Sequence, residues 1–222
     1  FTDVNNDATR VEVNTISAEM AKVRDYVPDY AVMAHRGSTF WAPEETESAW
    51  RWAREMGADY LESDLQCTKD GVILANHDDN LKRTTNIENV YSELVPATRK
   101  AFYMRHGMSE AEAEKLVAAD KASFRPYYAM SYMYEELLAL DAGSWFNETS
   151  IEQARESFSE QHQYISALED QIRYAEGKML ARDADGERIY TVTGTWNPDK
   201  PRDCLTYKFE YVDDPQDTGN RP

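Results

Sequence analysis

Two acidic side chains, Glu62 and Asp64, are separated by one residue in the segment Asp59-Tyr-Leu-Glu-Ser-Asp-Leu65. The segment has the composition of a strand, and residues two apart on a strand project from the same face. Two neighbouring carboxylates repel each other and are costly to bury unless a cation lies between them. Oxygen ligands favour calcium, magnesium or manganese over zinc. The spacing therefore indicates a divalent cation site, although an edge strand with a solvated acidic face has the same pattern.

The histidines favour the cation site. The chain has only four of them, and two, His35 and His77, each end a short apolar run. In parallel α/β folds, catalytic groups collect at the carboxyl ends of the strands. Two histidines beside a carboxylate-bound cation can act as general base and general acid, and the guanidinium of Arg36 can bind a phosphate. Together these residues favour a metal-dependent site that cleaves a phosphoester.

A strand–helix–strand unit has to position these side chains. The apolar run Tyr30–His35 predicts a buried strand, Thr46–Met56 predicts a helix, and Asp59–Leu65 predicts the next strand. Such a unit indicates an α/β fold with a parallel sheet. Lys69-Asp70-Gly71 predicts a tight turn ahead of a further extended piece, Val72–His77.

Other segments have helix or strand patterns of their own. Ser109 and Glu112 have the spacing of a capping box and predict the start of a helix. The remaining predicted elements are helices over Ser17–Tyr26, Met133–Leu140 and Ser150–Lys178, and a β-hairpin formed by Glu187–Val192 and Leu205–Val212.

The overall composition excludes some functions. The chain has 222 residues, with 41 acidic against 24 basic side chains and a formal charge of −17. Because nucleic acid is bound through basic surfaces, no nucleic-acid partner is expected. No apolar run approaches the length of a membrane span, so no transmembrane segment is expected. Cys67 and Cys204 are too few for a disulfide framework or a zinc site, and one bridge or two free thiols are both open.

Several blocks in order resemble the glycerophosphodiester phosphodiesterase family. A linked series of this kind is far more specific than any single motif. The blocks are His35-Arg36-Gly37, Ala42-Pro43-Glu44-Glu45-Thr46, Gly57-Ala58-Asp59-Tyr-Leu-Glu62-Ser-Asp64, Thr68-Lys69-Asp70-Gly71, His77-Asp78 and Leu81-Lys-Arg83-Thr84-Thr85, followed by Leu140–Phe146 and Ile165–Glu169.

The resemblance implies a (β/α)8 barrel that hydrolyses glycerophosphodiesters to an alcohol and sn-glycerol 3-phosphate. It assigns His35 as the base and His77 as the acid, Glu62 and Asp64 as ligands of Ca2+ or Mg2+, and Arg36 as the phosphate-binding residue. The expected partner is a small glycerophosphodiester. In the family picture the base helps the neighbouring glycerol hydroxyl attack phosphorus, and water then opens the resulting cyclic phosphate.

The same resemblance divides the chain into three parts. Residues 1–85 hold an N-terminal segment and the first βα units of the barrel with the catalytic motifs. Residues 86–165 form a helical insertion, expected to cover the mouth of the barrel, and residues 166–222 a helix and a β-hairpin leading toward the next barrel strand. The family's third metal carboxylate belongs on that next strand, for which the sequence shows no candidate. We therefore expect the C-terminal remainder of the barrel as a second piece.

The chain departs from the family in the second block, where Glu45 stands in place of the usual asparagine. Its first residue is Phe1 rather than methionine, and with the habit of the family this favours a periplasmic or secreted protein. Two other functions stay open. One is a related barrel phospholipase of the sphingomyelinase D or lysophospholipase D type. The other is a non-catalytic module or fragment that needs a second chain.

Overall fold

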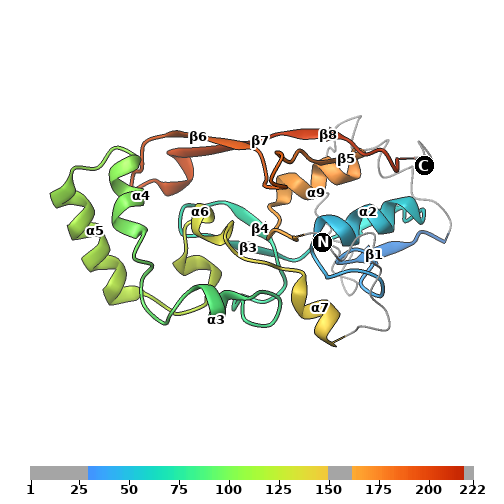
Figure 1. The fold of residues 1–222 in the computed structure, drawn as a ribbon, viewed down its shortest axis with the longest axis horizontal. Helices are drawn as coiled ribbons and strands as arrows, with labels where there is room; N and C mark the ends of the chain where they lie inside the picture. Colours follow the sequence, from blue (N-terminus) through green and yellow to red (C-terminus); the bar gives the residue numbers. More distant parts are fainter. Residues whose placement is uncertain (1–29, 150–161, 218–222) are drawn as a thin grey trace, which may run out of the picture. The chain divides into compact units, whose positions relative to one another are not determined.

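The computed structural model describes residues 30–149 and 162–217 (Figure 1). All of them except residues 30–32 belong to one compact unit, Met33–Pro222. The helix predicted over Ser17–Tyr26 lies outside the described residues, as does part of the one predicted over Ser150–Lys178.

A parallel pair of short strands opens the described unit. β1 (Met33–His35) pairs with β2 (Tyr60–Glu62), and the register places His35 opposite Glu62. Helix α2 (Glu47–Glu55) connects the two strands, so the predicted strand–helix–strand unit is confirmed. The prediction that the first strand is buried was wrong: Met33 is 62% exposed, because the described sheet has two strands and leaves β1 partly uncovered. Gly37, which follows β1 closely, has a φ of 88°, and a Cβ there would lie 2.6 Å from the Cβ of Ala49. Only glycine allows this strand end to approach α2 so closely.

The segment predicted as one strand over Asp59–Leu65 is two strands in the structure. β2 ends at Glu62, and β3 (Leu65–Cys67) pairs antiparallel with β4 (Ile73–Ala75). The turn between β3 and β4 is at the predicted position, and Gly71 supplies its positive φ of 89°. The prediction of one continuous strand was therefore wrong, because the chain changes its pairing partner at Ser63 and Asp64.

Asp70 in this turn is buried and anchors the hairpin. Its carboxylate accepts hydrogen bonds from the Thr68 hydroxyl at 2.6 Å, the Tyr134 backbone N–H at 2.9 Å and the Tyr207 hydroxyl at 2.5 Å. These donors come from the hairpin itself, from α6 (Tyr134–Leu137) and from β7 (Leu205–Phe209). The acidic residue of the Lys69-Asp70-Gly71 motif thus joins three parts of the unit.

The helical region begins after β4. The capping box predicted at Ser109 is confirmed, because both of its reciprocal bonds with Glu112 are present at the start of α5. The helix predicted near Met133–Leu140 is shorter in the structure. The helices of this region are α3 (Ile87–Val90), α4 (Arg99–Arg105), α5 (Glu110–Ser123), the 3-10 helix η2 (Ala129–Ser131), α6 (Tyr134–Leu137) and α7 (Ser144–Thr149).

A segment predicted as helix lies alongside β4 instead. Residues 162–167 form no helix: Ala167 bridges antiparallel to Leu74, and the N–H of Ala75 donates to the carbonyl of Ser166 at 2.8 Å. Helix α9 starts only at Leu168 and ends at Ala175. The buried side chains of Ile165 and Ala167 pack into a core while the backbone is paired, and this pairing outweighs the helical pattern.

The predicted β-hairpin is confirmed. β6 (Tyr190–Gly194) pairs antiparallel with β7 (Leu205–Phe209), and η3 (Pro201–Asp203) lies in their connection. The chain continues directly into β8 (Tyr211–Asp213), which pairs with β5 (Lys178–Leu180). Figure 1 shows β7 and β8 running end to end beside α9.

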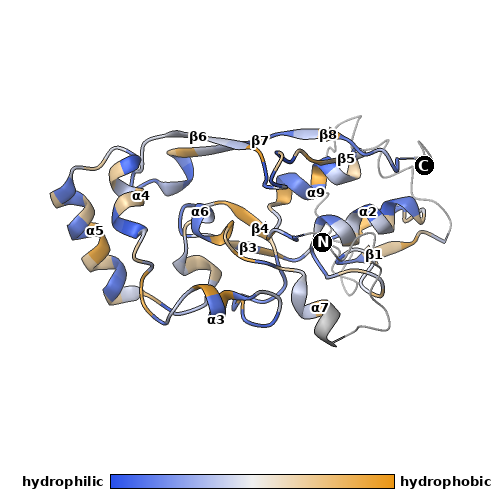
Figure 2. Ribbon diagram, viewed as in Figure 1, coloured by the Kyte–Doolittle hydropathy of each residue, from blue (hydrophilic) through white to orange (hydrophobic). Residues whose placement is uncertain are grey.

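Three apolar clusters hold these parts together. Trp196 and Leu205 of the hairpin region share one cluster with Phe102 and Tyr103 of α4. α2 packs on α9, with the rings of Trp50 and Tyr174 5.9 Å apart. Figure 2 shows the apolar residues following β3 and β4, at the centre of the unit. The helical region and the C-terminal ribbon therefore form a continuous packed body.

Both cysteines are free thiols. Among the described residues, no helix combines the length and apolar content that crossing a membrane requires.

Candidate active site

The carboxyl ends of β1 and β2 bring together three of the predicted residues. His35 ends β1, Glu62 ends β2 opposite it, and Asp64 follows two residues later. One potential ligand atom from each of these side chains lies within 4.8 Å of the others. His35 is exposed, and the two carboxylates are half-buried. Elsewhere in residues 30–149 and 162–217, no other group of three such side chains is close enough to hold an ion.

These side chains fit a divalent cation. The Oδ2 atom of Asp64 is buried and accepts no hydrogen bond. Its charged neighbour is the Nε atom of Arg36 at 2.9 Å, in an orientation that forms an ion pair but no hydrogen bond. The two carboxylates offer oxygen donors, which suit a hard cation such as Ca2+, Mg2+ or Mn2+. A buried carboxylate oxygen without a donor is costly, and a cation removes that cost.

Arg36 lies between three acidic side chains. Its backbone is in the left-handed region, with a φ of 58°, and its N–H donates to Oε2 of Glu62 at 3.0 Å. The guanidinium forms an ion pair with Asp64 and contacts Glu44 at 3.3 Å. A left-handed conformation is uncommon for an arginine and is tolerated where the surroundings hold it. Here it keeps the guanidinium at the edge of the carboxylate cluster.

A chain of ion pairs connects this cluster with His77. Glu44 accepts from both terminal nitrogens of Arg83, at 2.7 and 3.1 Å. The Nε of Arg83 donates to one oxygen of Asp78 at 2.6 Å, and the other oxygen lies 2.5 Å from Nδ1 of His77. These residues all lie in the motifs that resemble the family, but their contacts with one another appear only in the folded chain.

Charge pairing shifts the acidities in this chain. The hydrogen bond from Arg83 is the main cause that lowers the pKa of Asp78 to about 2, with a further contribution from His77. Burial alone would raise the pKa of Glu44, but Arg83 and Arg36 outweigh it and lower that pKa below its ordinary value. Both carboxylates are therefore ionised at neutral pH.

His77 is near the cluster but not part of it. It lies two residues after the end of β4, and its side chain is 43% exposed. The neighbouring Asn76 donates its backbone N–H to the carbonyl of Asp64 at 2.9 Å, which fixes the segment beside the β2–β3 break. The structure thus brings His35, Arg36, Glu62 and Asp64 together and places His77 at the exposed rim.

Glu45 was not among the predicted site residues, yet it contacts the cluster directly. It is only 4% exposed, and its carboxylate accepts from the N–H of Asp64 and from the hydroxyl of Ser63, both at 2.8 Å. Burial is the main cause that raises its pKa to about 7, and these two hydrogen bonds oppose that effect. One feature of the sequence could have pointed to Glu45: it stands where the resembled motif usually has asparagine.

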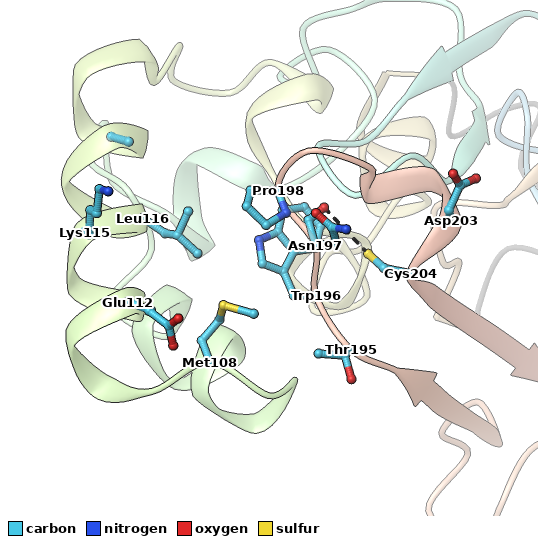
Figure 3. Close-up of a pocket in the computed structure, with 11 residues that line it drawn as sticks. Met108, Glu112, Lys115, Leu116, Thr195, Trp196, Asn197, Pro198, Asp203 and Cys204 are labelled. Atoms are coloured by element: carbon cyan, nitrogen blue, oxygen red, sulfur yellow. Dashed lines mark hydrogen bonds between the residues drawn. The ribbon is translucent and has the colours of Figure 1, made fainter.

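A groove of about 720 Å3 lies away from these residues, between α5 and the connection from β6 to β7 (Figure 3). Leu116 of α5 and Trp196 face each other across it, and Met108 and Pro198 add apolar surface. It contains none of the predicted catalytic, phosphate-binding or metal-binding residues.

The parallel β1–β2 unit and the polar cluster at its carboxyl end define an α/β protein with a histidine and two carboxylates grouped at the ends of neighbouring strands. The chain belongs to the glycerophosphoryl diester phosphodiesterase family, whose sequence model matches residues 35–200, more than half of the chain. Its fold is therefore of the α/β class of this family.

Individual relatives agree with this membership. A glycerophosphodiester phosphodiesterase of Bacillus subtilis (strain 168) is 31% identical over 126 residues, which are 57% of this chain and 30% of that protein. The glycerophosphoinositol inositolphosphodiesterase GDPD2 of Mus musculus is 28% identical over 69% of this chain and 24% of its own length. The chain spans less than a third of the length of these curated relatives.

Solved structures of the same kind are also similar. A phosphodiesterase of Oleispira antarctica, in complex with the product sn-glycerol-3-phosphate, is 25% identical with a TM-score of 0.41. The match covers 67% of this chain and 40% of that one. A glycerophosphodiester phosphodiesterase of Agrobacterium tumefaciens matches with 24% identity, a TM-score of 0.41, and coverage of 66% of this chain and 42% of that one.

Proposed function

We propose that this chain carries the catalytic residues of a metal-dependent glycerophosphodiester phosphodiesterase, which releases an alcohol and sn-glycerol 3-phosphate. The observation that supports it most strongly is the cluster of His35, Glu62 and Asp64 beside Arg36, in a chain of this family. Glu62 and Asp64 would hold Ca2+ or Mg2+. When bound, the cation withdraws negative charge from the phosphoryl oxygens and keeps the phosphate in place.

The two histidines have separate tasks in this proposal. His35 takes the proton from the glycerol hydroxyl next to the phosphodiester as that oxygen bonds to phosphorus. The bond from phosphorus to the alcohol oxygen breaks, and His77 donates a proton to that oxygen. In the second half of the reaction a water molecule opens the cyclic phosphate, with the two proton transfers reversed. Arg36 binds a non-bridging phosphoryl oxygen and stabilises the charge that collects there.

Removal of the cation is expected to abolish the reaction. With a chelator present, hydrolysis of glycerophosphocholine should stop, and Ca2+ or Mg2+ in excess should restore it. Glu62→Gln and Asp64→Asn should each weaken Mn2+ binding by more than about 100-fold, because each removes one anionic ligand. The measurements are glycerol 3-phosphate release and an electron paramagnetic resonance titration with Mn2+. Chelator-resistant hydrolysis by a protein that binds no Mn2+ would contradict the proposal.

The same assay separates the alternative activities. A phospholipase of the lysophospholipase D type should release lysophosphatidic acid from lysophosphatidylcholine and leave glycerophosphocholine intact. A non-catalytic module should bind Mn2+ without turning over either substrate.

Asp78 is expected to orient the proton donor. Because its carboxylate lies 2.5 Å from Nδ1 of His77, that nitrogen keeps its proton and Nε2 is directed to the substrate. Asp78→Asn should lower kcat by about 10- to 100-fold, the size expected for losing a charge-assisted hydrogen bond. KM and Mn2+ affinity should change little. The control is Asp79→Asn, which changes the exposed neighbouring residue. An equal loss of kcat in both variants would contradict the role of Asp78.

A further inference from the structure

Glu45 connects the ends of the two parallel strands. Its backbone N–H donates to the carbonyl of Arg36 at 3.1 Å, immediately after β1. Its side chain reaches the other strand, where one oxygen accepts from the N–H of Asp64 and the other from the hydroxyl of Ser63. One residue is therefore bonded to both polypeptide segments that carry the cluster.

The contacts of Glu45 lie where the strand pairing changes. β2 ends at Glu62 and β3 begins at Leu65, so Ser63 and Asp64 belong to neither ladder. The N–H of Asp64 would lack a strand partner here, and the Glu45 carboxylate supplies one. Without this acceptor the segment that carries Asp64 loses one of the bonds that set its backbone, and the position of the Asp64 carboxylate depends on that backbone.

The conformation of Glu45 is itself costly. Its φ of 60° is in the left-handed region, which asparagine adopts more readily than glutamate. Asparagine, the residue usual at this position in the resembled motif, offers one acceptor oxygen on a shorter side chain. A glutamate offers two acceptor oxygens and reaches Ser63 and Asp64 at the same time. The backbone strain at Glu45 is therefore offset by two hydrogen bonds to the segment that carries Asp64.

We propose that Glu45 is a positioning residue that clamps the Ser63–Asp64 segment to the end of β1 and thereby sets the Asp64 carboxylate for cation binding. This role depends on the proposed function only because it assumes that Asp64 binds a cation. The clamp itself is a property of the protein without metal and can be measured separately.

The first test uses hydrogen exchange with chelator present. In Glu45→Ala, the backbone amide of Asp64 should exchange about tenfold faster or more, because its side-chain acceptor is gone. Ser63→Ala removes only the hydroxyl contact and should leave this amide protected. The matched control is Glu47→Gln, since Glu47 is equally buried at 5% exposure but pairs with Arg51 and Arg182 instead. Unchanged exchange at Asp64 in Glu45→Ala would overturn the clamp.

The second test measures Mn2+ binding by the full chain. Glu45→Ala should raise the Mn2+ dissociation constant by about 10- to 100-fold, the range typical for residues that orient a metal ligand. Glu45→Gln should stay close to the unsubstituted protein, since its amide oxygen still accepts from Asp64 and its NH2 can donate to Ser63. At saturating Mn2+ the hydrolysis rate of Glu45→Ala should recover, which a misfolded variant would not show.

The outcomes separate the two proposals. Tight Mn2+ binding by Glu45→Ala overturns the role of Glu45 and leaves the proposed function standing. A loss in Glu45→Gln as large as that in Glu45→Ala also overturns it, because charge rather than position would then be the cause. If the unsubstituted chain binds no Mn2+, the cation site of the proposed function is overturned. The role of Glu45 in placing Asp64 for a cation is then overturned as well.

Discussion

Replacing His35 by asparagine is expected to lower the hydrolysis of glycerophosphocholine by about 10²- to 10⁴-fold, the contribution typical of a general base. His35 is exposed at the end of β1, and its imidazole lies with Glu62 and Asp64. In the proposed reaction its task is to take a proton, so the loss should be in kcat. The Mn2+ dissociation constant should change by less than about threefold, since both carboxylates remain.

The structure provides a matched control for this substitution. His106 is buried at 7% exposure, and its Nε2 forms a hydrogen bond with a carboxylate oxygen of Glu135 at 2.9 Å, away from the cluster. His106→Asn should leave kcat unchanged even if it lowers stability. If His35→Asn weakens Mn2+ binding as strongly as Glu62→Gln does, His35 is a cation ligand rather than the base, and the assignment would have to be reversed.

Replacing Asp170 by alanine is expected to lower the free energy of unfolding by about 3–5 kcal/mol, the cost of leaving a buried charge without its partner. Asp170 is fully buried, forms an ion pair with Arg188, and accepts from the Tyr211 hydroxyl at 2.6 Å. Its second oxygen accepts from the N–H of Ala167 at 2.7 Å, which caps the start of α9. Arg188 also donates to the Tyr134 hydroxyl at 2.7 Å, so the change would leave several buried groups unpaired.

Urea denaturation would measure this loss. The matched control is the exposed pair Arg173 and Glu169 on the outer side of the same helix, where Arg173→Ala should cost less than about 1 kcal/mol. The double change Asp170→Asn with Arg188→Met should recover part of the stability, because no buried charge then remains. A loss in Asp170→Ala no larger than in the exposed control would contradict the buried ion pair.

Much of the site followed from local sequence patterns. His35 could be chosen because it ends an apolar run, and Glu62 and Asp64 because residues two apart on a strand share a face. The carboxyl ends of parallel strands then bring these side chains together. The start of α5 at Ser109 was equally predictable, since both partners of its capping box are three residues apart. Patterns of this kind depend on neighbours along the chain and are visible in one sequence.

Other features depended on partners far along the chain. The break of the second strand at Ser63 and Asp64 is fixed by Glu45 and by the pairing of β3 with β4. The non-helical path of residues 162–167 depends on β4, about 90 residues earlier in the chain, whose backbone N–H at Ala75 is paired by Ser166.

The sequence by itself determined the family of this protein, the strand–helix–strand unit and the identity of the clustered histidine, arginine and carboxylates. Only the tertiary structure decided that Glu45 clamps Asp64, that Arg83 joins Glu44 to Asp78, and that Arg188 is buried against Asp170. The physical reason is that a side chain's type and periodicity are local, whereas its burial and its hydrogen-bond partner are set by packing between distant segments.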